Sequence, residues 1–540
     1  MRARPLLERR GPDSLKSWKS RDGRSELLHA RLAIVDPGGM AHQPLSDPDT
    51  GTTLAFNGEI YNYPELRAEL PDYPYRTSSD TEVILAAYRR WGIQGLSRLR
   101  GMFALALADG ATGHMYLARD PIGKKPLFVA NWDGSTLFGS SAAALVAASG
   151  RVGAIDSASV ADYWADGHVS PTRSIFAGCR PVAPGEVVEI RPNGTSRSFH
   201  VAPSSAGENQ RTRDPDELAE LLRISVRRRL RNNPQPVSLL SGGIDSTVVT
   251  TAIHRESSVQ VLTLGALIPF TLDERYARYA ARKLGLSLEI VPAGVGRIED
   301  GLDFSMNLQD EPLGMMSFFP LALLLRAMKP YGRILFSGDG GDEVFLGYGQ
   351  PSDWTARSGD AAKVNGLQCG PELPSWMSAW GRQTVTRVLV GHMFTKLDRA
   401  SAEQGIEMRC PLLDWDVMAF ARTLEPSVLF GADRPKHLLK DQLREWPSWF
   451  VDRPKVGFAY HLRWAWALRG YSGLRDRIEA EAVETFRPSL AGCLQRPVSE
   501  WSGRDIWGHF PQVWKLLAWS AFLRRQREMA RPRVLEAVAQ

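Results

Sequence analysis

The sequence predicts an α/β protein: an N-terminal layered α+β sandwich, followed by a doubly wound parallel sheet with a helical C-terminal part. In the first 195 residues, many short apolar strands accompany only two helical patterns, which is typical of sheets layered with helices. After residue 215, strands and helices alternate, which favours a parallel sheet that binds ligands at the carboxyl ends of its strands. Two of those strands end in glycine-rich turns, at 241–243 and 338–341.

The bulk composition indicates a soluble globular enzyme. The 540 residues are 43% hydrophobic and 23% charged, and 66 basic against 60 acidic residues give a net charge of +6. This length predicts two or three domains. No apolar run reaches the length of a membrane span, and the N-terminus lacks an apolar signal segment. The basic clusters are interpreted as solvated helix faces, not as a nucleic-acid interface. Scattered cysteines without metal-like spacing predict reduced thiols and a cytoplasmic location: Cys179, Cys369, Cys410 and Cys493.

Three signals organise the first part of the chain. Residues 29–36 alternate as a strand does, with Arg31 near its start. Residues 54–62 form a strand interrupted by Asn57-Gly58, a pair that is typical of hairpin turns. Asp80 is predicted to cap a helix, because apolar residues recur after it at helical spacing.

Together with residues 9–13, 101–107 and 117–127, these strings resemble the glutaminase domain of glutamine-dependent asparagine synthetases of the bacterial AsnB type. The resemblance covers most of residues 9–195 and implies the N-terminal-nucleophile hydrolase fold. It implies that five residues hold glutamine: Arg31, Asn57, Gly58, Glu59 and Asp80. Arg31 suits the α-carboxylate, while Glu59 and Asp80 suit the α-ammonium group. Asn57 and the Gly58 N–H suit an oxyanion.

One feature of that family is missing from the sequence. Its nucleophile is a cysteine at the mature N-terminus, whereas this sequence begins Met1-Arg2 and has no cysteine before Cys179. We therefore expect either a start further upstream or a truncated domain that does not hydrolyse glutamine by the family mechanism.

Residues 1–195 are thus expected to form a glutaminase-like domain, and 216–540 a synthetase-like domain. The segment 196–215 between them is rich in Ser, Gly, Asn and Arg, which predicts a linker.

The string 237–246 predicts a strand, a tight loop and a helix start. Gly242 and Gly243 allow the backbone to approach a ligand, and the helix N-terminus favours an anion. Ser241 and Ser246 add hydroxyl donors, and Asp245 suits a magnesium ion beside a polyphosphate. The string Ser-Gly-Gly-Ile-Asp-Ser resembles the pyrophosphate-binding loop of ATP pyrophosphatases.

The second glycine loop resembles its partner in the same family. The match implies that Ser337 and Gly338 contact the nucleotide, that Asp339 serves acyl-adenylate formation and that Asp342 binds magnesium. By position, Leu240 and Leu264 are also expected at the nucleotide.

Two further strings match the family. Lys455, in the string 453–458, is expected to stabilise the departing pyrophosphate. Asp398 and Arg399 fall in a matching string but are equally well explained as an internal ion pair.

These signals predict an ATP-dependent amide-forming ligase that uses ATP and Mg²⁺. A carboxylate, aspartate or a related acid, would be adenylated and then attacked by ammonia. An apolar stretch at 313–320 favours a less polar acyl group. The expected partners are small molecules (ATP, glutamine or ammonia, and the carboxylate acceptor) and a second copy of the chain, but neither nucleic acid nor membrane.

Two alternatives stay open. One is an amine-using or ring-forming synthetase that resembles β-lactam synthetases or lasso-peptide cyclases and needs no glutaminase. The other is a non-catalytic, glutamine-sensing or scaffold protein.

Overall fold

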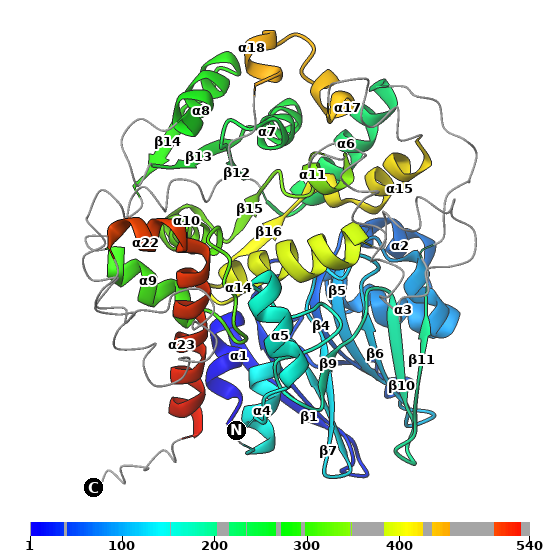
Figure 1. Cartoon of the computed structure of the whole chain (residues 1–540). Helices are drawn as coiled ribbons and strands as arrows, with labels where there is room; N and C mark the ends of the chain where they lie inside the picture. Colours follow the sequence, from blue (N-terminus) through cyan, green and yellow to red (C-terminus); the bar gives the residue numbers. More distant parts are fainter. Residues whose placement is uncertain are drawn as a thin grey trace, which may run out of the picture.

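The computed structural model describes residues 2–36, 40–151, 153–201, 203, 215–233, 235–265, 272–292, 298–345, 347, 383–424, 435–453 and 502–530. Figure 1 shows an N-terminal part, residues 2–203, built on antiparallel sheets, and a C-terminal part, residues 215–530, built on a parallel sheet. Among the described helices, none combines the length and the apolarity needed to cross a bilayer.

The N-terminal part contains the following elements, in chain order: α1 Arg4–Arg10, β1 Ser14–Lys19, β2 Glu26–Arg31, β3 Leu45–Ser46, β4 Thr53–Ile60, α2 Tyr63–Glu69, α3 Asp80–Trp91, the 3₁₀ helix η1 Gly92–Arg98, β5 Gly101–Ala108, β6 Met115–Arg119, β7 Phe128–Trp132, β8 Ser135–Gly139, α4 Ala142–Ser149, α5 Ser157–Asp166, β9 Cys179–Pro181, β10 Glu186–Ile190 and β11 Ser196–His200.

These elements form four layers. Side chains alternate along each strand, so each sheet can pack against a different layer on either face. The central sheet has the order β11-β10-β6-β5-β4-β3. On β5, Leu105 and Leu107 pack against α2 and α3, whereas Ala104 and Ala106 face the strands of the second layer, β1-β2 and β8-β7-β9. On the outer side of that layer, β7 packs against α4, α5 and the C-terminal helix α23, Phe510–Ala530. The predicted layered sandwich is confirmed.

Three local predictions in this part are wrong. β4 runs without a turn through Asn57 and Gly58 and pairs with β5 over its whole length. Gly58 has φ 153°, and a Cβ there would lie 2.0 Å from the carbonyl oxygen of Met102, so close strand packing explains this glycine. β2 ends at Arg31 and does not begin near it. Ser79 is the cap of α3, since its side chain accepts the N–H of Thr81; Asp80 is the first helical residue.

The C-terminal part contains these elements: α6 Pro215–Leu230, β12 Val237–Leu239, α7 Ile244–Glu256, β13 Gln260–Leu264, α8 Leu272–Lys283, β14 Leu288–Val291, α9 Ile298–Asn307, α10 Phe318–Met328, η2 Lys329–Tyr331, β15 Ile334–Phe336, α11 Gly341–Val344, the π-helix η4 Gln383–Phe394, α14 Thr395–Ala402, β16 Glu407–Arg409, η5 Pro411–Leu413, α15 Trp415–Thr423, α17 His437–Asp441, α18 Ser448–Val451, α22 Gly503–Gly508 and α23.

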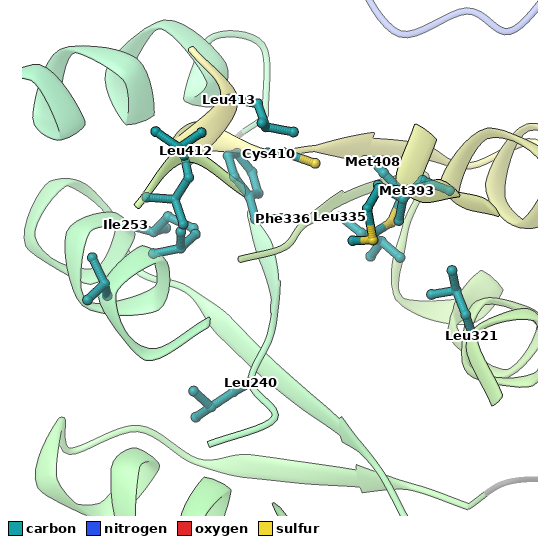
Figure 2. Close-up of a cluster of buried hydrophobic side chains, with 14 of the residues drawn as sticks. Leu240, Ile253, Leu321, Leu335, Phe336, Met393, Met408, Cys410, Leu412 and Leu413 are labelled. Carbon is teal, nitrogen blue, oxygen red and sulfur yellow. The ribbon is translucent and has the colours of Figure 1, made fainter. Parts of the chain in front are cut away.

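The parallel sheet has the order β14-β13-β12-β15-β16. The first strand of this part, β12, therefore lies between the second and the fourth, so the order reverses between β12 and β15. In doubly wound sheets, ligands bind where the order reverses, at the carboxyl ends of the strands. The two glycine loops follow β12 and β15, as the sequence predicts. Figure 2 shows part of the apolar core beneath them, where Leu240, Ile253, Phe336 and Cys410 are buried.

The linker boundary and one strand differ from expectation. The first residues of the predicted linker form β11, which pairs with β10, and residues 204–214 lie outside the described residues. β16 was not predicted, because its Glu-Met-Arg sequence carries no strand pattern of its own; it forms by pairing with β15. In Figure 1, α14 and β16 lie on the side of the C-terminal part that faces the antiparallel sheets.

Candidate functional site

The two glycine loops are packed against one another. A Cβ at Gly338 would lie 2.4 Å from the backbone nitrogen of Ser246, and a Cβ at Gly341 would lie 2.4 Å from Cγ of Asp245. Any side chain at either position would force the loops apart. The glycines of the second loop therefore let it contact the start of helix α7.

The first loop presents hydroxyl groups and the N-terminus of α7. The Oγ atoms of Ser241 and Ser246 are 3.1 Å apart, and Ser246 also donates to the Gly243 carbonyl. Gly242, at φ 74°, packs so closely against α8 that a Cβ would lie 2.5 Å from the Ala277 nitrogen. The positive end of the α7 dipole lies at this loop and suits a phosphate.

The second loop places Ser337 beside Asp339, whose Oδ2 accepts its hydroxyl at 2.7 Å. Two further residues were predicted at the nucleotide. Leu240 directly follows β12, and Leu264 is the last residue of β13. Leu240 is fully buried in the core, and its N–H donates to the Leu262 carbonyl at 2.8 Å, so this structure exposes no part of it to a ligand.

A lysine links the two predicted magnesium ligands. Nζ of Lys436 lies 2.7 Å from Oδ2 of Asp245 and 2.5 Å from Oδ1 of Asp342. Burial lowers the pKa of Lys436, but the two carboxylates outweigh it and hold that pKa above its usual value. A cation already lies between the two carboxylates, and hard oxygen donors suit Mg²⁺. Two carboxylates that already share one cation are a donor pair that Mg²⁺ could also use, although no cluster of three or more metal-ligating side chains occurs among the described residues.

No role was predicted for Lys436, although it precedes the matching string that contains Lys455. Arg453 was likewise missed: it donates to the Gly242 carbonyl at 2.6 Å and stacks 3.7 Å above the Tyr276 ring. Lys455 itself lies outside the described residues.

A second site lies in the N-terminal part, in a cavity of about 460 Å³. It lies between β2 and β8, whose residues line it on both sides. Among the described strands, β2 pairs only with β1 and β8 only with β7. The cavity is lined by all five residues predicted to hold glutamine: Arg31, Asn57, Gly58, Glu59 and Asp80.

The polar groups of this cavity are held by specific contacts. Arg31 donates to the carbonyls of Val35 and Asp36, at 3.0 and 2.7 Å. Nδ2 of Asn57 donates to Ser140 at 3.2 Å. Asp80 accepts the Ile60 N–H at 2.8 Å. The other oxygen of Asp80 accepts the Ser79 hydroxyl at 3.2 Å, and these two contacts hold the carboxylate at the cavity wall.

Glu59 contacts a residue of the C-terminal part. Its Oε1 lies 3.3 Å from Nη2 of Arg409, which is 1% exposed. Burial raises the pKa of Glu59 well above its usual value, and the neighbouring carboxylates of Glu407 and Asp80 raise it further, against the guanidinium of Arg409. Burial likewise raises the pKa of Asp80 to about 6, although the Ile60 N–H opposes this.

The raised pKa of Asp80 predicts a pH-dependent stability. Its usual value is 3.8, so the folded state keeps its full stability below that pH and loses some as the pH rises through about 6. We expect Asp80→Asn to be more stable than wild type at pH 7.5, by on the order of 1–3 kcal/mol and therefore with a higher unfolding temperature, and to be about as stable as wild type at pH 4.

Thermal unfolding at the two pH values checks this expectation. Asp109→Asn is the control, because hydrogen bonds from Tyr88, Thr112 and Ala111 hold the pKa of Asp109 below its usual value despite burial. Asp109→Asn should therefore lose stability at neutral pH. An equal destabilisation by Asp80→Asn at both pH values would contradict the argument.

Of the cysteines that the structure describes, neither lines the cavity. Cys179 is buried, and burial raises the pKa of its thiol to about 12. Cys410 is buried beside Ser337, with 3.4 Å between Sγ and Oγ. The described residues thus bring the five predicted side chains together around one cavity but supply no thiol to it.

The contacts of Asp398 and Arg399 and the burial of residues 313–320 can be compared with the predictions. Asp398 pairs with Arg10 at 2.8 Å, and Arg399 pairs with Asp310 and Glu311 at 2.8 Å each. Both are ion-paired, but not to each other. In the apolar stretch 313–320, Leu313, Met315 and Phe318–Pro320 are buried, whereas Gly314, Met316 and Ser317 are partly exposed; its link to the acyl substrate stays a prediction.

Comparisons with known proteins match both parts of the chain to known families. A glutamine amidotransferase domain matches residues 1–200, and the asparagine synthase family matches residues 217–384 and 371–498. A putative glutamine-hydrolysing asparagine synthetase of Mycobacterium tuberculosis is 28% identical, over 89% of this chain and 88% of its own. Glutamine-hydrolysing asparagine synthetase B of Escherichia coli is 27% identical, over 89% and 82%. Asparagine synthetase 1 of Bacillus subtilis is 31% identical, over 64% and 54%. The asparagine synthase match alone spans more than half of the residues, and the chain belongs to the glutamine-dependent asparagine synthetase family of the AsnB type.

Proposed function

We propose that the protein is an ATP-dependent amide-forming ligase that adenylates a carboxylate in its C-terminal part and takes nitrogen from glutamine or ammonia. One observation carries the proposal most directly: two glycine loops and two carboxylates, Asp245 and Asp342, meet where the strand order of a doubly wound sheet reverses. This is the place and the donor set that a magnesium-bound polyphosphate requires.

The proposed reaction has two steps. The carboxylate oxygen attacks the α-phosphorus of ATP, which forms an acyl-adenylate and releases pyrophosphate. Ammonia then attacks the acyl carbon and expels AMP. Adenylation is needed because a carboxylate at neutral pH is a poor electrophile.

The residues would act on the phosphates and on the acyl group. Ser241, Ser246 and the N-terminus of α7 would bind the pyrophosphate, and Lys455 would stabilise its departing charge. Asp245 and Asp342 would hold Mg²⁺, which supplies further charge compensation. Asp339 would lie at the forming adenylate.

In the N-terminal cavity, Arg31 would pair with the α-carboxylate of glutamine, and Asp80 and Glu59 would face its α-ammonium group. The five predicted residues line one cavity, which favours a glutamine-binding ligase over a ring-forming synthetase that uses its substrate's own amine. Aspartate or a related acid is the proposed acyl substrate.

Pyrophosphate release from Mg-ATP tests the proposal. We expect aspartate, or another acid in a panel of amino dicarboxylates and their less polar analogues, to stimulate release when ammonium chloride is present. Arg31→Ala should leave the ammonium-dependent rate unchanged and weaken glutamine binding by about tenfold or more, since a charged hydrogen bond is lost. Absence of stimulated release with every acid and either nitrogen source would refute the ligase assignment.

A further inference from the structure

The inner end of the glutamine cavity is built by both parts of the chain. Glu59 and Asp80 of the N-terminal part line it together with Glu407, a residue of β16 in the C-terminal part. The three side chains are buried, at 5%, 4% and 5% exposure. Two cations face Glu59: the guanidinium of Arg409 and the ammonium group of Lys125.

Three carboxyl groups, those of Glu59, Asp80 and Glu407, lie near one another here. Arg409 is shared, because it contacts Glu59 at 3.3 Å and Glu407 at 2.7 Å. Glu407 also repels both Glu59 and Asp80 electrostatically. Buried carboxylates without full compensation favour a cationic ligand group. Arg31 lines the same cavity, so the walls offer both a cation and a cluster of anions to a zwitterionic amino acid.

The carboxylate of Glu407 is held rigidly. Its backbone N–H donates to the Arg333 carbonyl at 2.7 Å, and Nε of Arg409 donates to its Oε1 at 2.7 Å. Lys124 of the N-terminal part donates to the carbonyl of the next residue, Met408, at 2.9 Å. These contacts fix β16 against the N-terminal part and keep Glu407 at the cavity wall.

We propose that Glu407 is a specificity-determining residue for the glutamine pocket: from the C-terminal part, it supplies a third carboxylate that selects ligands with a free α-ammonium group. The inference rests on the proposed binding of glutamine in this cavity. It follows that the pocket is complete only when the two parts of the chain are docked.

Calorimetric titration of the full chain tests this, with L-glutamine and with 4-carbamoylbutanoate, which has the same carbon chain but no amino group. We expect wild type to prefer glutamine. Glu407→Gln should reduce that preference by about tenfold or more, because it removes a charge-assisted contact. Glu407→Asp, which keeps the charge, should retain most of the preference.

Glu403→Gln is the matched control. Glu403 lies on the same segment, is similarly buried and pairs with Arg10 at 3.8 Å, but it does not line the cavity. Its substitution should leave the preference unchanged. If Glu407→Gln weakens both ligands equally, Glu407 is only structural and the inference is wrong. If folded wild type binds neither ligand, the glutamine pocket itself is refuted; if it binds glutamine but prefers it no more than the analogue, only the inference fails.

Discussion

Replacing Asp245 by asparagine is expected to lower pyrophosphate release by about 100-fold or more, the range seen when one electrostatic group is removed from a reacting centre. Asp245 is the residue on which both loops and the buried cation converge: Gly341 packs against its carboxyl group, and Lys436 binds both of its oxygens, at 2.8 and 2.7 Å. Asparagine keeps the shape but removes the negative charge that the proposed Mg²⁺ site needs.

Two measurements separate this effect from loss of structure. Release of pyrophosphate should be followed across a magnesium titration, because a weakened metal site predicts partial recovery at high Mg²⁺. Asp216→Asn is the control: Asp216 also lies in the C-terminal part but is 77% exposed and 3.7 Å from Arg444, so its rate should match wild type. A wild-type rate for Asp245→Asn would remove Asp245 from the site.

The sequence predicted most of these features where the signal is local. Each glycine loop could be read from one short string, because a strand, a turn and a helix start follow directly in sequence. The five residues of the N-terminal cavity were also predicted, through the resemblance of several strings. In both cases the signal comes from several polar and glycine residues in one string, a combination that ordinary turns rarely require.

What could not be predicted depends on contacts between distant residues. The Asn57-Gly58 pair carries a hairpin signal, but pairing with β5 keeps β4 extended. β16 is a strand only because β15 lies beside it. The position of Lys436 between Asp245 and Asp342 joins residues far apart in sequence. Nothing local to the string 405–414 shows that Glu407 and Arg409 meet Glu59.

Arg409 is expected to be the costliest residue to replace at the contact between the two parts. It contacts Glu59 and Glu407, donates to the Arg229 carbonyl and lies 5.7 Å from the Tyr61 ring centroid. Arg409→Met would leave two buried carboxylates without their guanidinium, which typically costs about 3–5 kcal/mol. We expect the thermal unfolding midpoint to fall by roughly 10 °C at pH 7.5.

The pH dependence of that loss identifies its cause. Because the pKa of Glu59 is already raised, and losing Arg409 removes the group that lowers it, the carboxylate can escape the penalty by binding a proton at low pH. The deficit of Arg409→Met should therefore shrink between pH 7.5 and pH 5. Arg231→Met is the control: Arg231 also bridges the two parts, to Glu65 at 2.6 Å, but is 34% exposed, so its loss should cost no more than about 1 kcal/mol at either pH. A deficit for Arg409→Met as small as that of Arg231→Met would mean that Glu59 and Glu407 do not depend on this guanidinium, and the charge balance of the cavity would have to come from another group.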